Sequence, residues 1–177
     1  MKKKIEFEGR AIVIRDLEGK PIDDIDTDMI FHNKHLHITN IEEMGQFAFG
    51  NLDNWQDFPN IAKSGNILIV AKNFGAGSSR QQAVDCFKAL GIEIIIGESF
   101  GAIYKRNAIN SGMPLIIAPN IMEEDVETED IIRVNLENGE IFNISKNAAL
   151  NQVNPLSQVQ LDIYHAGNLF EYGKRIK

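Results

Sequence analysis

Three short apolar runs alternate with two amphipathic stretches in the middle of the chain. The runs cover residues 67–71, 92–96 and 115–118, and the stretches between them span about 80–90 and 99–111. The runs are rich in β-branched residues and of strand length, whereas the stretches repeat apolar residues at a helical spacing. This order predicts parallel strands joined by right-handed helical crossovers, with the loops that follow the strands gathered at one edge of the sheet.

Patterns on both sides of this unit predict further elements. We expect a strand over 5–14, a turn over 16–21, and a hairpin of 131–136 and 141–144 joined through Asn138-Gly139. An amphipathic helix is predicted over about 157–170, with a frayed polar tail at 174–177. The acidic run 123–130 is interpreted as a solvated connection. The chain should therefore form one α/β domain over 1–177, with a partly parallel sheet, flanking helices and no linker.

Cap signals mark where the predicted helices begin and end. Thr39 or Asn40 should cap a short helix within 41–51, Gly91 should end the first helix of the middle unit, and Ser99 should cap the second. An aromatic-rich segment contains Phe47, Phe49, Leu52, Trp55 and Phe58. We interpret it as a loop packed on the core. A docking surface for a second subunit is the alternative, because aromatic residues concentrate at interface anchors.

The composition is that of a globular protein. The chain has 177 residues, of which 44% are hydrophobic and 24% are charged, and this length can bury a sizeable core. No apolar run reaches membrane-spanning length, and the charged N-terminal segment does not fit a signal peptide, so we expect a cytoplasmic protein without a membrane partner. The net charge of −7 argues against duplex nucleic acid as a general partner.

Cys86 is the only cysteine and lies in the first predicted helix of the middle unit. A buried, inert thiol is the favoured interpretation. One cysteine cannot form an internal disulfide, and it cannot hold a cubane iron–sulfur cluster, which is normally anchored by several thiolates.

The candidate chemistry lies in the turn between the strand at 67–71 and the helix after it. Gly75 and Gly77 permit backbone angles closed to other residues and allow a ligand to approach the main chain. Ser78, Ser79 and Arg80 follow, so helix N–H groups, two hydroxyls and a guanidinium could converge on a carboxylate or phosphate. Alternatively, one serine only caps the helix, but capping needs a single hydroxyl. We therefore predict an anion site.

Several other motifs do not fit. The turn lacks the Gly-Lys-Ser/Thr of a P-loop, the third glycine of a dinucleotide fingerprint and the second glycine of a nucleophile elbow. The acidic segment 23–30 resembles a calcium loop, but Met29 and His35 stand where that loop needs a glycine and an acid. His32, His35 and His37 could gather a metal by their spacing, but no cysteine or acid stands beside them, so exposed loop residues are favoured.

Three ordered blocks between residues 24 and 118 resemble one known family. They are Asp26-Thr27-Asp28, the segment 73–80 that reads NFGAGSSR, and the segment 98–110 that reads ESFGAIYKRNAIN. Together they look like the small subunit of 3-isopropylmalate dehydratase, the swivel domain of the aconitase superfamily. The resemblance implies a single aconitase-swivel-like β/β/α domain with a mobile substrate-recognition loop around 31–60.

The resemblance also implies roles for individual residues. Ser78 matches the family's catalytic base, acting as an alkoxide, and Ser79 and Arg80 match residues that hold a substrate carboxylate. Asp28 would reach the active site, and His37 would lie in the loop that reads the variable substituent of the substrate. The implied enzyme is a heterodimeric hydro-lyase that isomerises a hydroxy di- or tricarboxylic acid, most commonly 3-isopropylmalate in leucine biosynthesis. No metal is expected on this chain, and a [4Fe-4S] cluster is expected on the large-subunit partner.

Two departures from the family pattern leave the substrate open. The usual Arg-Glu-His-Ala reads Arg80-Gln81-Gln82-Ala83, and the usual Tyr-Leu-Arg-type loop signature reads His35-Leu36-His37. Homoaconitate, dimethylmalate or another methyl-substituted malate are the alternative substrates. Two other classes of function also stay open. One is a non-catalytic anion-binding regulatory module, and the other is a stand-alone hydrolase with Ser78 as nucleophile, which has no clear histidine partner.

Overall fold

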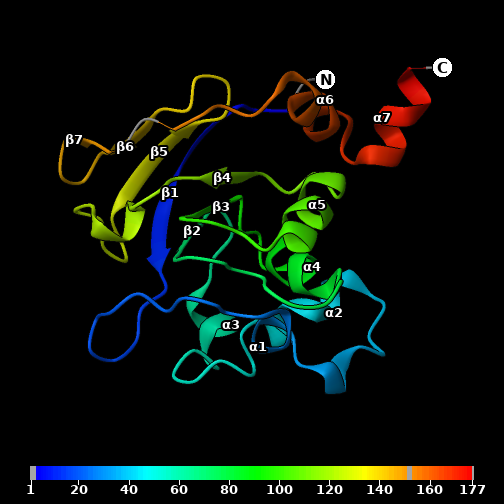
Figure 1. The fold of residues 1–177 in the computed structure, drawn as a ribbon, viewed down its shortest axis with the longest axis horizontal. Helices are drawn as coiled ribbons and strands as arrows, with labels where there is room; N and C mark the ends of the chain where they lie inside the picture. The colour runs from blue at the N-terminus through cyan, green and yellow to red at the C-terminus, as the bar shows by residue number, and fades with distance from the viewer. Residues whose placement is uncertain (1–2, 151–152, 177) are drawn as a thin grey trace.

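The computed structural model describes residues 3–150 and 153–176, which form a mixed sheet flanked by helices (Figure 1). Seven strands in this part of the chain follow the order β4-β3-β2-β1-β5-β6-β7. The strands are β1 (Glu6–Val13), β2 (Ile67–Val70), β3 (Ile94–Gly97), β4 (Leu115–Ile117), β5 (Ile131–Asn135), β6 (Ile141–Asn143) and β7 (Ala148–Ala149). The α-helices are α1 (Thr27–Ile30), α2 (Ile41–Met44), α3 (Phe58–Ile61), α4 (Gln82–Ala89), α5 (Ala102–Asn110), α6 (Gln158–Ala166) and α7 (Leu169–Arg175).

Strands β1 to β4 form the parallel half of the sheet. β2 pairs with β1 and β3, and β3 pairs with β4, all in parallel. Helices α4 and α5 connect β2 to β3 and β3 to β4 (Figure 1). The strand and helix order predicted for the middle of the chain is therefore confirmed. β2 and β3 are buried at every residue, as expected for parallel strands covered on both faces.

The two faces of the parallel half carry different layers. Neighbouring residues of a strand point to opposite faces. Ile12 and Leu68 pack in one core with α4, α5 and the aromatic segment, whereas Val13 and Ile69 pack in a second core with β5, β6 and α6. The antiparallel strands and α6 thus cover one face and α4 and α5 the other, which confirms the β/β/α arrangement expected from the family resemblance.

The antiparallel half contains the predicted hairpin and one further strand. β5 and β6 pair on either side of Asn138-Gly139, and Gly139 adopts the left-handed conformation (φ +75°) that favours glycine in such turns. β7 was not predicted, because a strand of two residues leaves no alternation to detect.

The predicted helix boundaries are partly wrong. Ser99 does not cap α5, which begins beyond it. Its hydroxyl instead accepts a hydrogen bond from the Asn73 N–H (2.7 Å). Asn40 caps α2 as predicted, and Gly91 follows α4 in the left-handed conformation (φ +75°). The Asn40 cap, which bonds within its own turn, was therefore predicted correctly from sequence. The Ser99 cap was not, because the Ser99 side chain bonds to a distant loop.

The C-terminal helix is two helices rather than one. α6 ends at Gly167, whose φ of +104° interrupts the helix. Lys174 and Arg175 form the last turn of α7, so the frayed tail was a wrong prediction for these two residues, and Lys177 lies outside the described residues. No helix in the described part of the chain is long and apolar enough to span a membrane.

The aromatic segment packs into the core, as predicted. Phe49 and Phe58 are fully buried. Their rings make edge contacts with each other at 4.9 Å and with Phe87 of α4 at 5.1 and 5.8 Å between centroids. Such aromatic pairs stabilise a core beyond their buried area. These contacts tie the segment to α4, and the mobility of the loop around 31–60 stays a prediction.

Most residues of the acidic connection 123–130 are exposed, as predicted, and some of its carboxylates also form ion pairs. Lys146 forms ion pairs with Asp125, with Glu127 (3.9 Å) and with Asp130 (3.6 Å). We call these four residues the Lys146 cluster. The cluster fixes the connection against the antiparallel half of the sheet.

Candidate functional site

Three loops meet at the carboxyl edge of the parallel strands, and they carry the three motif blocks. They comprise residues 24–28 after β1, 73–80 after β2 and 98–101 after β3, and we call them the three-loop edge. The backbone bonds that join them run from Gly75 N to the Ile25 carbonyl (2.7 Å), from Thr27 N to the Ala76 carbonyl (2.9 Å) and from Gly101 N to the Phe74 carbonyl (2.9 Å). The predicted gathering of loops at this edge is therefore confirmed.

The two glycines of the central loop have different surroundings. Gly75 is buried with φ +77°, and a Cβ there would collide with the Tyr104 ring. Its N–H donates to the Ile25 carbonyl and is therefore not free for an anion, and a role of the Gly75 backbone in an anion site stays a prediction. Gly77 is exposed with φ +97°. The first glycine thus permits close packing, and only the second lies where a ligand could approach.

Ser78 and Ser79 are both exposed, and neither caps a helix. α4 begins at Gln82, after an N-cap residue, Gln81, whose side chain makes no capping bond. The capping alternative is therefore wrong for both serines. Ser79 Oγ accepts a hydrogen bond from Asn107 Nδ2 (3.2 Å), whereas the Ser78 hydroxyl has no hydrogen-bond partner within residues 3–150 and 153–176.

Arg80 lies beside the serines and is largely enclosed, with 11% of its side chain exposed. Its Nη1 donates to the Asp28 carboxylate (2.9 Å) and to the carbonyls of Thr27 (3.2 Å) and Phe31 (2.7 Å). Nε and Nη2 make no hydrogen bond to the described residues. One nitrogen therefore fixes the guanidinium, and the other two keep N–H groups for an anion.

Asp28 is the partner that fixes Arg80. Its Oδ1 also accepts from the Asn33 N–H (2.8 Å), and its Oδ2 accepts from Asn51 Nδ2 (2.9 Å). The hydrogen bond from Arg80, helped by the Asn33 N–H, holds the pKa of the Asp28 carboxyl below its usual value. The structure thus brings Asp28 to the site, where both of its oxygens contact protein groups, and its geometry suits orienting Arg80.

His37 lies in a loop that contacts the start of α4. Gln82 Nε2 donates to the Leu36 carbonyl (3.3 Å), which places the loop beside the serine turn. His37 itself is exposed, and its Nδ1 lies 3.1 Å from the Lys34 carbonyl. Gln82, one of the departures from the family pattern, therefore links the loop to the three-loop edge.

The other loop histidines have structural contacts. His35 stacks on Phe47 with 4.0 Å between ring centroids, and burial, followed by the nearby Lys34, lowers its pKa. His32 Nδ1 accepts from the Lys34 N–H (3.1 Å). In the described part of the chain, no group of three or more histidine, cysteine or acidic side chains could hold a metal ion.

Cys86 is fully buried in α4, which confirms the predicted location of the thiol. Burial raises the pKa of this thiol well above its usual value. An iron–sulfur cluster is normally anchored by several thiolates, and this sequence has one cysteine, so the donor set of this chain does not fit such a cluster.

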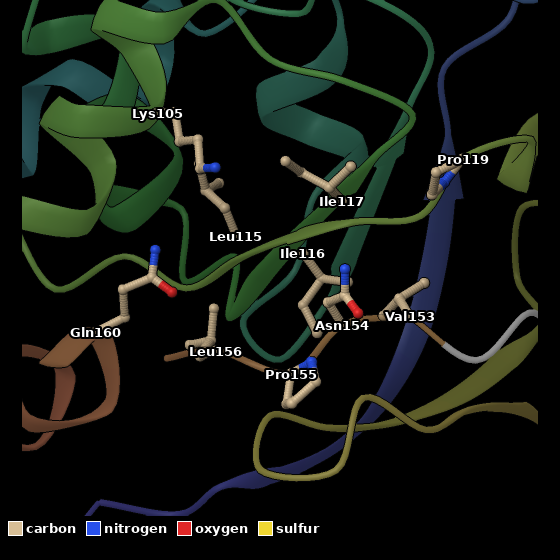
Figure 2. Close-up of a pocket in the computed structure, with 10 residues that line it drawn as sticks. All are labelled: Lys105, Leu115, Ile116, Ile117, Pro119, Val153, Asn154, Pro155, Leu156 and Gln160. Atoms are coloured by element: carbon tan, nitrogen blue, oxygen red, sulfur yellow. The ribbon is translucent and has the colours of Figure 1, made fainter. Parts of the chain in front are cut away.

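A groove of about 400 Å³ lies elsewhere, between β4 and the segment that leads into α6. Figure 2 shows its lining, with Lys105 and Gln160 on the left and Val153 and Pro119 on the right. None of the predicted site residues lines this groove. The site chemistry is therefore on the exposed loops and not in this hollow.

Comparison with known proteins agrees with the three motif blocks. The aconitase C-terminal domain family matches residues 22–120, more than half of the chain, and this range contains all three loops of the three-loop edge. The chain belongs to this aconitase family.

Relatives of this aconitase-family chain are small subunits. The 3-isopropylmalate dehydratase small subunit of Metallosphaera sedula is 38% identical over 154 residues, which are 87% of this chain and 92% of the relative. The isopropylmalate/citramalate isomerase small subunit of Methanocaldococcus jannaschii is 42% identical over 151 residues, 85% of this chain and 88% of the relative. A crystal structure of 3-isopropylmalate dehydratase from M. jannaschii superposes with a TM-score of 0.84 at 33% identity and covers 97% of this chain and 95% of that chain.

The aconitase-family resemblance inferred from the motifs is thus confirmed. The sequence interpretation missed three asparagines that hold the predicted residues: Asn33 and Asn51 on Asp28, and Asn107 on Ser79. Asn107 lies within the third motif block, three residues after Tyr104, so helical spacing placed the two on one face of α5. Asn33 and Asn51 carried no local signal.

Proposed function

We propose that this chain is the small subunit of a heterodimeric hydro-lyase that isomerises 3-isopropylmalate by dehydration and rehydration, in leucine biosynthesis in the cytoplasm. One observation carries the proposal. The three-loop edge presents Ser78, Ser79 and two unused nitrogens of Arg80 together, with Arg80 fixed by Asp28. Dehydration of a hydroxy acid needs a base for the carbon-bound proton and fixed donors for the carboxylates.

The proposed roles follow from the contacts of each residue. Ser78, whose hydroxyl has no protein partner in the described chain, acts as an alkoxide, as the family resemblance implies, and accepts the proton from the substrate carbon. Ser79 and Arg80 bind a carboxylate, because both keep N–H or O–H donors that find no acceptor among residues 3–150 and 153–176. His37 contacts the substituent that varies among substrates, since Gln82 holds its loop beside the serines.

A second subunit completes the site. One buried cysteine cannot supply the several thiolates that normally anchor a cluster, so we assign the [4Fe-4S] cluster to the large subunit. Ser78 and Ser79 are exposed in the isolated chain, as expected for groups that act on a substrate held between two subunits.

Citramalate is a second candidate substrate. The M. jannaschii relative, which is 42% identical, is named for both isopropylmalate and citramalate. Both are hydroxy dicarboxylic acids that differ in one alkyl substituent, so the same serine and arginine contacts would bind either. The loop around His37 would decide between them.

Reconstitution with the cluster-bearing large subunit tests the proposal. The two-chain complex should dehydrate 3-isopropylmalate, and a panel of citramalate, dimethylmalate and homoaconitate measures its preference by kcat/KM. The isolated chain should be inactive and should bind no iron stoichiometrically. Turnover by a rigorously purified single chain would contradict the two-subunit assignment. A complex that forms but turns over no member of the panel would favour the regulatory-module alternative.

A further inference from the structure

Helix α5 supports the loop that carries the serines. The Tyr104 ring packs directly under Gly75, before the serines, and its hydroxyl donates to the Ala83 carbonyl, after them, at 3.1 Å. Tyr104 is only 1% exposed. One buried side chain therefore supports the turn on both sides of the serines, whereas orienting a serine hydroxyl takes a separate contact.

Asn107 supplies that contact. It lies three residues after Tyr104, so the two side chains leave α5 on the same face. Its Nδ2 donates to Ser79 Oγ at 3.2 Å. Within residues 3–150 and 153–176, this is the one side-chain hydrogen bond made to either serine of the turn.

The direction of this hydrogen bond decides whether the Ser79 hydroxyl can donate to a ligand. A serine hydroxyl has one proton to donate and two lone pairs to accept with. Because the Asn107 amide occupies a lone pair, the Ser79 proton is left for another acceptor, such as a substrate carboxylate. Hydrogen bonds in a chain also strengthen one another. Ser78 has no such amide donor within the described chain. Of the two neighbouring serines, only Ser79 therefore has a hydroxyl oxygen that accepts a hydrogen bond from a protein side chain.

We propose that Asn107 is a positioning residue for substrate binding, which holds Ser79 so that its hydroxyl donates to a substrate carboxylate. This inference rests on the proposed function of the chain. It adds a residue that touches no substrate and acts through Ser79.

The test is a double-mutant cycle in the reconstituted two-chain complex, with 3-isopropylmalate as substrate. Asn107→Ala should raise KM by about 2- to 10-fold, the range expected for one lost hydrogen bond, with kcat largely kept. Asn107→Asp should raise KM more, at least about tenfold, because its carboxylate would accept the hydrogen bond that Ser79 otherwise donates to the substrate, and it would repel the substrate carboxylate. In the Ser79→Ala background, Asn107→Ala should have no further effect on KM.

Asn110→Ala is the matched control, since Asn110 lies on the same helix and its side chain makes no hydrogen bond to the described residues. It should leave KM unchanged. Effects of Asn107→Ala and Ser79→Ala that multiply independently would overturn the proposal. A lower thermal midpoint with unchanged KM would overturn it as well. Activity of the wild-type complex separates the two hypotheses: an inactive complex overturns the proposed function and this inference together, whereas an active one that tolerates Asn107→Ala overturns only the role of Asn107.

Discussion

The three-loop edge and the Lys146 cluster both gather charged residues, but they use them differently. In the Lys146 cluster, one ammonium pairs with three carboxylates from a single connection. At the three-loop edge, Arg80 pairs with Asp28 through one nitrogen and leaves two nitrogens without protein partners in the described chain. The density of charge is greater in the Lys146 cluster, yet its cation is fully occupied by protein groups. Unpaired donors, rather than charge, therefore distinguish the candidate site.

The two regions also differ in what holds them. The three-loop edge is fixed by backbone hydrogen bonds between loops that follow three neighbouring strands. The Lys146 cluster is fixed by long side chains, of which Asp125 and Glu127 are each 78% exposed. Exposed ion pairs contribute little to stability and are screened by salt. A geometry suited to binding therefore comes from the loops, whereas the exposed ion pairs of the cluster contribute little to stability.

Removing the Ser78 hydroxyl should have the largest effect on activity. In the reconstituted complex, Ser78→Ala should lower kcat by at least about 10²-fold, the lower range for a positioned base, with KM largely kept. Ser79→Ala should instead raise KM, at a loss of roughly 1.5–3 kcal/mol. Neither change should lower the thermal midpoint, because neither serine caps α4. Steady-state kinetics and melting of both variants check this, and equal, purely thermal effects would contradict the catalytic assignment.

Arg80→Lys should have the next largest effect. A lysine cannot both bond Asp28 and present a planar pair of donors to a carboxylate. The loss should be about 2–4 kcal/mol in kcat/KM terms, with the fold kept. Arg106→Lys on the exposed part of α5 is the matched control and should change little. A loss at Arg80 no larger than at Arg106 would remove Arg80 from the substrate contacts.

Asp28→Asn tests the ion pair that holds Arg80. Its effect on activity should be smaller than that of Arg80→Lys. The pKa of Asp28 is lowered in the folded chain, so its stabilising contribution is present above the unfolded value of about 4 and is lost as the pH falls through the lower folded value. The variant should therefore melt below the wild type at pH 7, and the difference should shrink as the pH falls below the unfolded value of about 4. Thermal midpoints measured across this range check the sign. A difference that does not change with pH would argue against the ion pair.

Lys146→Met should have the smallest effect on activity. It breaks the Lys146 cluster and leaves three carboxylates close together, so the thermal midpoint should fall. Because the cluster lies outside the three-loop edge, kcat and KM should stay at the wild-type values. Melting and kinetics of the same complex check both statements. A change in KM comparable to that of Arg80→Lys would show that the Lys146 cluster and the three-loop edge are coupled, which would contradict separate roles for the two regions.

Local patterns predicted most of the fold but not all of its helix caps. The runs in the middle of the chain identified β2, β3 and β4, because burial on both faces leaves an apolar signal in each strand. Ser99 shows the limit of such reasoning. It stands where a cap is expected, yet its hydroxyl bonds to Asn73, 26 residues away. The local sequence is the same whether such a side chain caps its own helix or bonds to a distant loop. Sequence alone therefore does not separate the two cases.

The sequence by itself determined the parallel unit, the family and the residue types of the candidate site. Only the tertiary structure decided how those residues are used. It showed that Gly75 packs on Tyr104, that Arg80 is fixed by a carboxylate 52 residues earlier, and that Ser79 accepts from an amide 28 residues later. The physical reason is that hydrogen-bond donors and acceptors are paired by position in space. Periodicity and propensity describe neighbours along the chain and say nothing of which distant groups meet.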